Sequence, residues 1–201
     1  MGILSFVKPD KIVLQKATEF EAIFEFRPLE PGYGVTIGNS LRRVLLNSLE
    51  GYAIIGINIV GADHEFATLK GITEDVTEII LNLKQVRIKN KLEQDVNLEK
   101  VTLSIKNKTE FTAGMIGEAS PTFEIMNPDL LICTMDSSAK LEIEITIGKG
   151  RGYVPAEENK EKNSHFGYIA VDAIYTPIKN VKYAIENTRV EQRTDFEILI
   201  M

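Results

Sequence analysis

The sequence predicts an α+β fold in which both ends of the chain form one outer domain and the middle forms an inserted, mostly antiparallel β-rich domain. Three observations predict this class. Stretches near both ends alternate apolar and polar residues with the period of a β-strand. Glycines and a proline introduce one amphipathic helix. A long middle block then consists of short alternating segments separated by polar turns, as in antiparallel sheets.

These patterns divide the chain into an outer domain of residues 1–51 and 177–201 and an inserted domain of residues 52–176. With 201 residues and 44% hydrophobic content, the chain is long enough to bury cores of this size. Its formal net charge of −6 argues against broad electrostatic binding of DNA or of an anionic membrane.

The first element is a strand predicted over residues 12–27. Its apolar side chains alternate with acidic ones, so one face should be buried and the other mostly acidic. The buried face would carry Phe20, Ala22, Phe24 and Phe26.

A helix follows the glycines at 32 and 34, which supply turn conformations that other residues rarely adopt. Thr36 is predicted to cap its first turn, and Gly51 to end it in a left-handed conformation. At about 100° per residue, five apolar side chains share one side of this helix. They are Ile37, Leu41, Val44, Leu45 and Leu49.

Leu46 lies on the opposite side of the same helix, among polar and charged residues that include Arg42 and Arg43. Two interpretations stay open from the residues alone. The face is either solvated with one isolated leucine, or a binding surface in which arginines surround an apolar side chain.

Residues 52–60 form a short β-rich segment, and a second helix should begin at Thr73 as its cap. Glu74 and Asp75 suit its first turn, and Lys84 suits its last turn, where a cation is favoured by the helix dipole. Its core side would carry Val76, Ile79, Ile80 and Leu83.

Residues 86–147 predict short strands whose inward residues alternate with polar neighbours. The inward residues include Leu103, Ile105, Phe123, Ile125, Leu141, Ile143, Ile145 and Ile147. Cys133, within an apolar segment, is interpreted as a small core residue rather than a nucleophile.

Residues Gly148–Asn163 contain glycines, a proline and a charged run, which predict a surface loop. Arg151 between two glycines, followed by Tyr153, is either part of a surface turn or a contact for a partner.

Strands are expected again over residues 168–175 and 181–190. Arg189, Glu191 and Arg193 alternate along what should be an extended segment, so their side chains should point in one direction.

No catalytic, cofactor-binding or metal-binding arrangement is predicted. Gly32–Gly38 has neither the spacing of a dinucleotide fingerprint nor the Lys-Ser or Lys-Thr of a P-loop. His64 and His165 are the only histidines, which is too few for a plausible zinc site.

The start of the chain lacks the pattern of a secretory signal, and no apolar run is long enough to span a bilayer. A single cysteine excludes an intrachain disulfide and fits a reducing compartment. The expected location is therefore cytoplasmic, with no membrane partner.

Four separated motifs carry a family resemblance: LEPGYGVTIGNSLRRVLLNSLEGYAI from Leu29, GITEDVTEIILNLK from Gly71, GRGYVPA from Gly150 and VEQRTD from Val190. Their order and spacing resemble the N-terminal dimerisation and assembly region of the bacterial DNA-directed RNA polymerase alpha subunit. The resemblance covers nearly the whole chain. Pro31 and Val35 depart mildly from the family pattern.

The resemblance implies a non-catalytic scaffold that forms a homodimer through the opening helix and recruits the beta and beta-prime subunits. Nucleotidyl transfer would belong to those partners. The family's partner contacts fall on Arg43, Leu46, Lys84, Val171 and Arg189, and Arg42 lies beside them. The dimer interface would use Ile37, Leu41, Val44, Leu45 and Leu49.

In the family, a further helix follows the position of Met201 and a separate DNA- and activator-binding domain comes after a linker. DNA would therefore be reached only through the assembled enzyme or through that domain. Two competing interpretations are an independent homodimeric protein-binding module and a small nucleotide-dependent enzyme.

Overall fold

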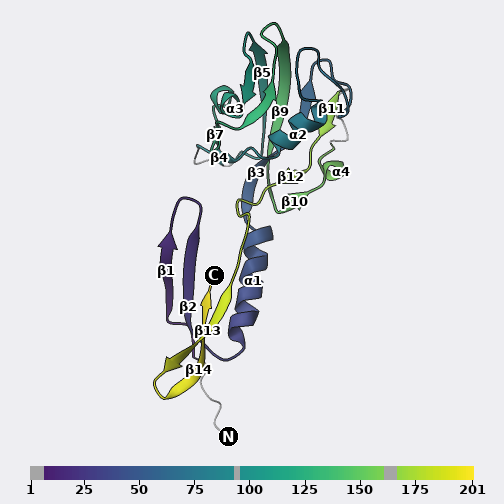
Figure 1. The fold of residues 1–201 in the computed structure, drawn as a ribbon. Coiled ribbons are helices and arrows are strands. Elements are labelled where there is room, and N and C mark those ends of the chain that lie inside the picture. Colours follow the sequence, from purple (N-terminus) through teal and green to yellow (C-terminus); the bar gives the residue numbers. More distant parts are fainter. Residues whose placement is uncertain (1–6, 93–95, 161–166) are drawn as a thin grey trace. The chain divides into compact units, whose positions relative to one another are not determined.

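The computed structural model describes residues 7–92, 96–160 and 167–201, and the fold is α+β with mostly antiparallel sheets, which confirms the predicted class (Figure 1). The chain forms two compact units. Unit 1 contains Met1–Ser48 and Ile178–Met201, and unit 2 contains Leu49–Pro177. The sequence placed the corresponding boundaries at 51/52 and 176/177.

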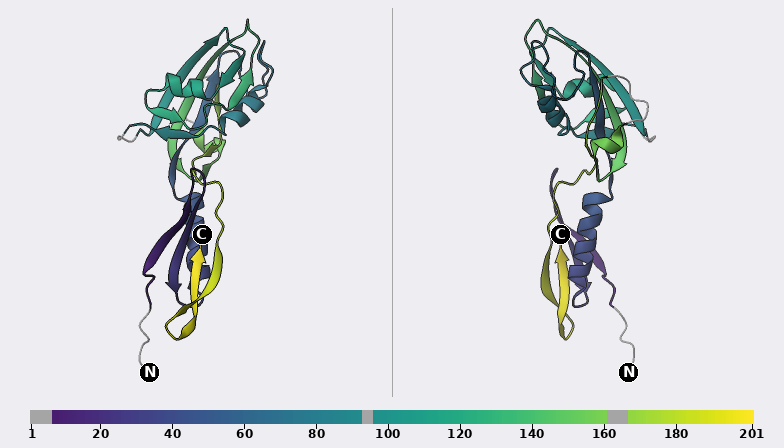
Figure 2. Two further views of the ribbon diagram at one scale, coloured as in Figure 1. Left: turned by 60° about the vertical axis from the view of Figure 1, so that its left-hand side comes forward. Right: turned by 90° about the vertical axis from the view of Figure 1, so that its right-hand side faces the viewer.

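Unit 1 is a four-stranded antiparallel sheet with one helix. The strands are β1 (Lys11–Ala17), β2 (Ala22–Leu29), β13 (Ala184–Val190) and β14 (Arg193–Ile200), in the spatial order β1-β2-β14-β13. The two ends of the chain therefore meet in the centre of the sheet, where β2 pairs with β14. Helix α1 (Tyr33–Asn47) lies along this sheet (Figure 2).

Helix α1 approaches the sheet through two glycines. A Cβ atom at Gly38 would lie 2.8 Å from the Tyr183 ring and 3.1 Å from Leu199, and one at Gly34 would lie 3.1 Å from Ile185. Both glycines are buried, and Leu41 and Leu45 follow on the same stripe of the helix. Close packing of α1 on the β13–β14 side of the sheet therefore requires glycine, which has no Cβ atom, at positions 34 and 38.

Two predictions about unit 1 were wrong. The expected single strand over residues 12–27 is a hairpin, whose turn is closed by hydrogen bonds between Thr18 and Glu21. Thr36 lies inside α1 rather than capping it, because the helix begins four residues earlier, after Gly32. Gly32 adopts a left-handed conformation with φ of 83°.

The first turn of α1 is instead capped by the other end of the chain. The backbone amides of Gly32 and Gly34 each donate a hydrogen bond of 2.8 Å to the carboxylate of Glu197 in β14. These donors belong to the set that a helix start leaves unpaired, and a carboxylate there also suits the helix dipole. The sequence prediction missed this cap because its acceptor comes from 163 residues away.

Unit 2 contains a larger antiparallel sheet in the order β5-β9-β3-β4-β7, with β11 paired to β3. Two small sheets, β6-β8 and β10-β12, complete it. The strand bounds are β3 (Glu50–Ile59), β4 (Ile88–Asn90), β5 (Leu98–Lys106), β6 (Glu110–Thr112), β7 (Phe123–Ile125), β8 (Leu131–Thr134), β9 (Lys140–Arg151), β10 (Tyr153–Val154), β11 (Tyr168–Ala170) and β12 (Ala173–Ile174).

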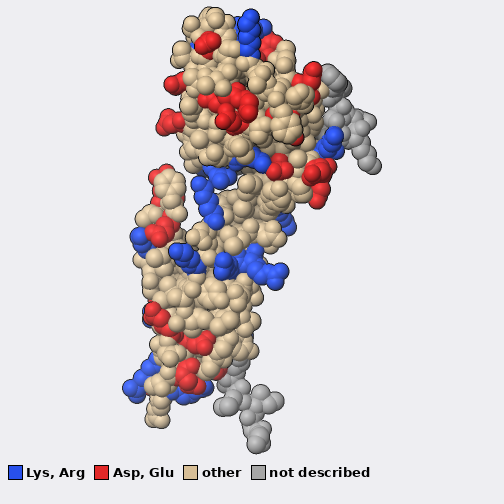
Figure 3. Space-filling model, turned by 45° about the vertical axis from the view of Figure 1, so that its right-hand side comes forward, with Lys and Arg blue, Asp and Glu red and all other residues tan. Residues whose placement is uncertain are grey.

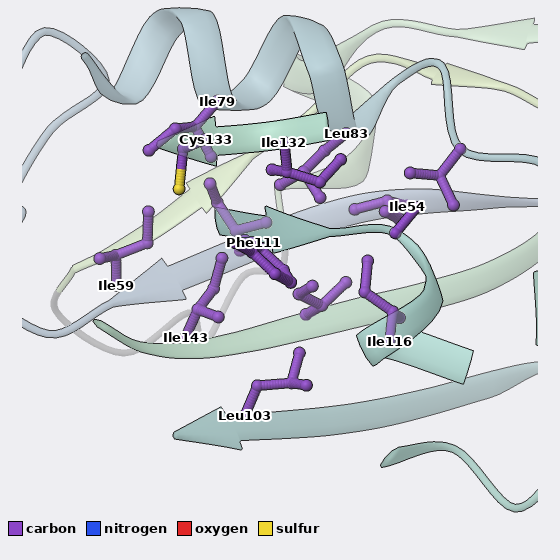
Figure 4. Packing of buried hydrophobic residues seen from close by; sticks show 14 of the residues in the cluster. Ile54, Ile59, Ile79, Leu83, Leu103, Phe111, Ile116, Ile132, Cys133 and Ile143 are labelled. Atoms are coloured by element: carbon purple, nitrogen blue, oxygen red, sulfur yellow. The ribbon is translucent and has the colours of Figure 1, made fainter. Parts of the chain in front are cut away.

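The core of unit 2 lies between this sheet and two helices, α2 (Val76–Leu83) and α3 (Gly114–Ala119). Figure 4 shows its side chains converging from strands and helices. The alternation predicted for β5, β7 and β9 is confirmed, because every apolar residue named for those strands is buried. Cys133 is also fully buried, and burial, helped by nearby Glu74, raises its thiol pKa to about 12. An unreactive core cysteine is therefore confirmed.

Three features of unit 2 differ from the sequence prediction. Gly51 lies within β3 instead of ending a helix, and Asp75 rather than Thr73 caps α2, in a capping box with Glu78. Part of the predicted loop at Gly148–Asn163 is ordered as the end of β9, as β10 and as the short helix α4 (Ala156–Asn159). Residues 161–163 of that loop lie outside the described residues.

Candidate functional site

The cluster of Arg42, Arg43 and Leu46 on α1 is, in one of the two interpretations left open by the sequence, a binding surface. Arg42 and Arg43 are exposed, and Leu46 is partly exposed. By the helical repeat, Arg43 lies opposite the stripe of Gly34 and Gly38 that packs on the sheet, and Arg42 and Leu46 lie on the flank of the helix between them. Guanidinium groups around an accessible leucine form the combination of charged rim and apolar centre that is common in protein interfaces.

A second region of unit 1 is apolar and uncovered. Leu199 packs against α1 and pairs with Phe26, which in turn pairs with Ile12, so these residues share the sheet face that carries the helix. Further along that face, Ile12 is 67% exposed and Leu14 52% exposed. Val44 of α1 is 47% exposed. We call Ile12, Leu14 and Phe24 of the sheet, together with Val44 of α1, the open apolar face of unit 1.

Unit 1 also buries few side chains of its own. Its buried apolar residues are Leu29, Val181, Phe196 and Leu199, and both buried hydrophobic clusters of the described residues lie in unit 2. Of the predicted dimer residues, Ile37, Leu41, Leu45 and Leu49 are only partly buried and Val44 is exposed. The apolar side of this amphipathic helix is therefore partly open to water, and apolar area gains stability only when it leaves water.

Lys84 forms an ion pair with Asp172, the residue after Val171, and the sequence prediction did not include Asp172. The Lys84 ammonium lies 2.6 Å from a carboxylate oxygen of Asp172. This hydrogen bond is the main cause of the lowered pKa of Asp172. Val171 is only 1% exposed and packs in the core, so its predicted direct contact with a partner has no accessible side chain to support it. No local pattern could reveal the pair, because its members are 88 residues apart.

Arg189 lies near the end of β13, where its Nε donates a hydrogen bond of 2.7 Å to the carbonyl oxygen of Glu191. The prediction that Arg189, Glu191 and Arg193 lie along one extended segment was wrong. Glu191 sits in the β13–β14 turn with φ of 55°, and Arg193 begins the next strand. Arg193 pairs with Asp195 and lies over the Phe196 ring.

In the region of the loop predicted around Arg151, two cations form ion pairs with a carboxylate of β3. Glu50 forms ion pairs with Lys149, at 2.8 Å, and with Arg151, its direct cross-strand neighbour. The Lys149 hydrogen bond, followed by that of Arg151, lowers the pKa of Glu50 from 4.5 to about 2. Arg151 is thus engaged within unit 2, although its side chain remains largely exposed.

A pH titration tests this pair of contacts. The folded pKa of Glu50 lies below its ordinary value, so its ion pairs are fully formed above pH 4.5 and are lost as the pH falls from 4.5 towards 2. We expect carbon NMR of the Glu50 carboxyl group to show an ionised group at pH 3.5. In Lys149→Met the midpoint should move up towards 4.5. A titration midpoint of Glu50 near 4.5 in the wild type would contradict its ion pairs with Lys149 and Arg151.

Other candidates from the sequence carry no site in this structure. The amides at the start of α1 are occupied by Glu197, so the Gly32–Gly38 segment presents no free anion cradle there. His64 is exposed, and His165 lies outside the described residues. Among residues 7–92, 96–160 and 167–201, no three His, Cys, Asp or Glu side chains gather as a metal site.

The described residues also contain no helix that is both long and apolar enough to cross a membrane. Figure 3 shows acidic and basic side chains interspersed on the visible surface of each unit. That face therefore lacks the continuous basic surface with which proteins follow a DNA backbone.

Comparison with known proteins identifies the family. Residues 55–176, which lie within unit 2, match the family model described as the RNA polymerase Rpb3/RpoA insert domain. The DNA-directed RNA polymerase subunit alpha of Cytophaga hutchinsonii is 61% identical over 201 residues, covering 100% of this chain and 60% of that protein.

Two further relatives carry the same name. The subunit from Flavobacterium psychrophilum is 58% identical over 200 residues, covering 100% of this chain and 60% of the relative. The subunit from Bacteroides fragilis is 56% identical over 201 residues, covering 100% of this chain and 61% of the relative. The chain thus spans about 60% of the length of these relatives. The matched insert domain and the three relatives agree, and the chain belongs to the family of bacterial RNA polymerase alpha subunits.

Proposed function

We propose that this chain is the assembly region of a DNA-directed RNA polymerase, in which two copies pair and hold the beta and beta-prime subunits. The observation that carries this proposal is the open apolar face of unit 1. A sheet and helix that bury so little by themselves gain a core when a second copy covers them. Pairing through Ile37, Leu41, Val44 and Leu45 would extend that face along α1, and Leu49, which follows the helix as the first residue of unit 2, stays a proposed dimer residue.

The large subunits would bind on the opposite side of α1, where Arg42, Arg43 and Leu46 are accessible. A single helix can serve two partners because its two sides are used separately. Lys84, Val171 and Arg189 stay proposed contributors to partner binding, the first two in unit 2 and the third in unit 1.

In this proposal, the chain contributes no catalytic group, and nucleotidyl transfer takes place in the partners. The chain would act in transcription within the cytoplasm and reach DNA only through the assembled enzyme or a further domain. The alternative of an independent homodimeric module has less support, since the relatives compared are all RNA polymerase subunits.

Capture of the beta subunit tests the proposed surface on α1. We expect Arg43→Ala and Leu46→Ala each to reduce recovery of co-expressed beta subunit on the tagged chain at least tenfold. The reason is that the first removes an exposed cation and the second the apolar centre of the surface, and about 1.4 kcal/mol of binding suffices for tenfold.

Lys182→Ala is the matched control, because it removes an exposed cation from unit 1 outside α1. It should leave capture unchanged. Circular dichroism of every variant should match the wild type. Undiminished recovery of beta with Arg43→Ala and Leu46→Ala would reject this surface.

A further inference from the structure

Asp172 accepts hydrogen bonds from two donors in unit 2, and we call these three groups the hub. One carboxylate oxygen lies 2.6 Å from the Lys84 ammonium, and the other accepts a hydrogen bond of 3.0 Å from the Ala156 amide. The hydrogen bond from Lys84 is the largest cause of the lowered pKa of Asp172, and the Ala156 amide adds to it. A carboxylate that accepts several hydrogen bonds beside a cation is held in one orientation.

The segment Tyr153–Asn159 is held in part by this hub, through the Ala156 amide. Its helix α4 has four residues and none of them is buried, so apolar packing does little to fix it. Strand β10 contributes two residue pairs with β12, and Asn159 donates a hydrogen bond of 2.9 Å to the carbonyl oxygen of Val171. Val154 also packs against the small buried cluster that includes Ala173 and Tyr175. The other attachments of the segment to residues 171–174 are polar.

Lys84 is the cation that stabilises the hub, and its backbone is fixed by the packing of α2. It follows α2, whose Val76, Ile79 and Leu83 are fixed in the core of unit 2. Its side chain is 22% exposed, and its ammonium is already bound by Asp172. An ammonium in this position has little freedom to reach a carboxylate on another protein.

We infer that Lys84 is a positioning residue, which acts on partner binding through Asp172 by holding the segment Tyr153–Asn159 in place. The surface that a partner meets is this segment, with Tyr153 at 59% exposure as its largest accessible apolar group. The inference rests on the proposed assembly function, and it replaces a direct contact of Lys84 with an indirect one.

A double-mutant cycle separates the two roles. Lys84→Gln and Asp172→Asn should each reduce capture of the co-expressed beta or beta-prime subunit about tenfold. The double variant should lose no more than either single variant, within about twofold, because both remove the same hub. Direct contact makes the opposite prediction, since Asp172→Asn would free Lys84 and leave capture undiminished. That outcome would overturn the inference.

Hydrogen exchange on the chain alone supplies a readout that needs no partner. The Ala156 amide should exchange at least tenfold faster in Lys84→Gln and in Asp172→Asn, while the amides of β9 stay as slow as in the wild type. Lys84→Arg keeps a cation at the hub and should restore both slow exchange and capture. Unchanged exchange at Ala156 would also overturn the inference.

The exposed pair Lys100–Glu144, at 3.3 Å, is the matched control in the same unit. Lys100→Gln should alter neither readout. If the wild-type chain captures neither large subunit, the assembly function fails, and with it the partner half of this inference. The inference alone fails in a different case. The wild type then captures the large subunits, and Lys84→Gln and Asp172→Asn accelerate exchange at Ala156 but leave capture unchanged.

Discussion

Replacing Gly51 by alanine is expected to lower the free energy of unfolding of unit 2 by about 3 kcal/mol, near the upper end of what an overpacked site costs. Gly51 pairs with Gly150 within the main sheet. An added Cβ atom would lie 1.9 Å from the carbonyl oxygen of Tyr175. Because this neighbour is backbone, a side-chain rotation cannot relieve the clash, and β3 must move away from the segment at Tyr175.

Hydrogen exchange of the β3 amides measures this loss, since those amides open only when the core of unit 2 opens. Exchange should accelerate about 100-fold, which corresponds to about 3 kcal/mol. Gly61→Ala is the control. A Cβ there meets open space, and only the φ of 94° opposes it, at about 1 kcal/mol. Equal effects of the two substitutions would show that the contact with Tyr175 is not limiting.

Placing a charge at Val44 is expected to abolish self-association of the chain over the concentrations at which the wild type pairs. If a second copy covers the open apolar face, Val44→Glu buries an unpaired carboxylate in the new interface. We expect the dissociation constant of the homodimer to rise at least 100-fold, about 2.7 kcal/mol. Sedimentation velocity over a concentration series measures it directly.

Asn39→Glu adds the same charge to the same helix, on the side that faces away from Val44. It should leave the homodimer intact. A dimer that tolerates Val44→Glu would place the contact elsewhere on unit 1. A wild-type chain that stays monomeric at high concentration would remove the basis for pairing through this face.

Much of the fold was predictable because its signals are local. The alternation of Leu141, Ile143 and Ile145 identifies a strand with one buried face, whatever the rest of the chain does. The core side of α2 follows from the helical repeat in the same way. The outward placement of Arg43 also agrees with that repeat, since α1 packs through its other side.

The remaining features depend on contacts between distant residues. The acceptor that caps α1 is Glu197, and the partner of Lys84 is Asp172, and neither follows from the residues beside them. Gly51 was misinterpreted for the same reason. A glycine after an apolar helix suggests a helix end, whereas here the demand for glycine comes from the backbone of Tyr175.

The Glu197 cap also affects the order in which the two units can fold during synthesis. Residues 49–177 emerge as one continuous stretch and contain their own core, so this part has all it needs to fold before the chain is finished. The amides of Gly32 and Gly34 must wait until residue 197 has been made. Nascent chains stalled shortly before residue 197 should therefore contain a folded unit 2, while the start of α1 still lacks its cap.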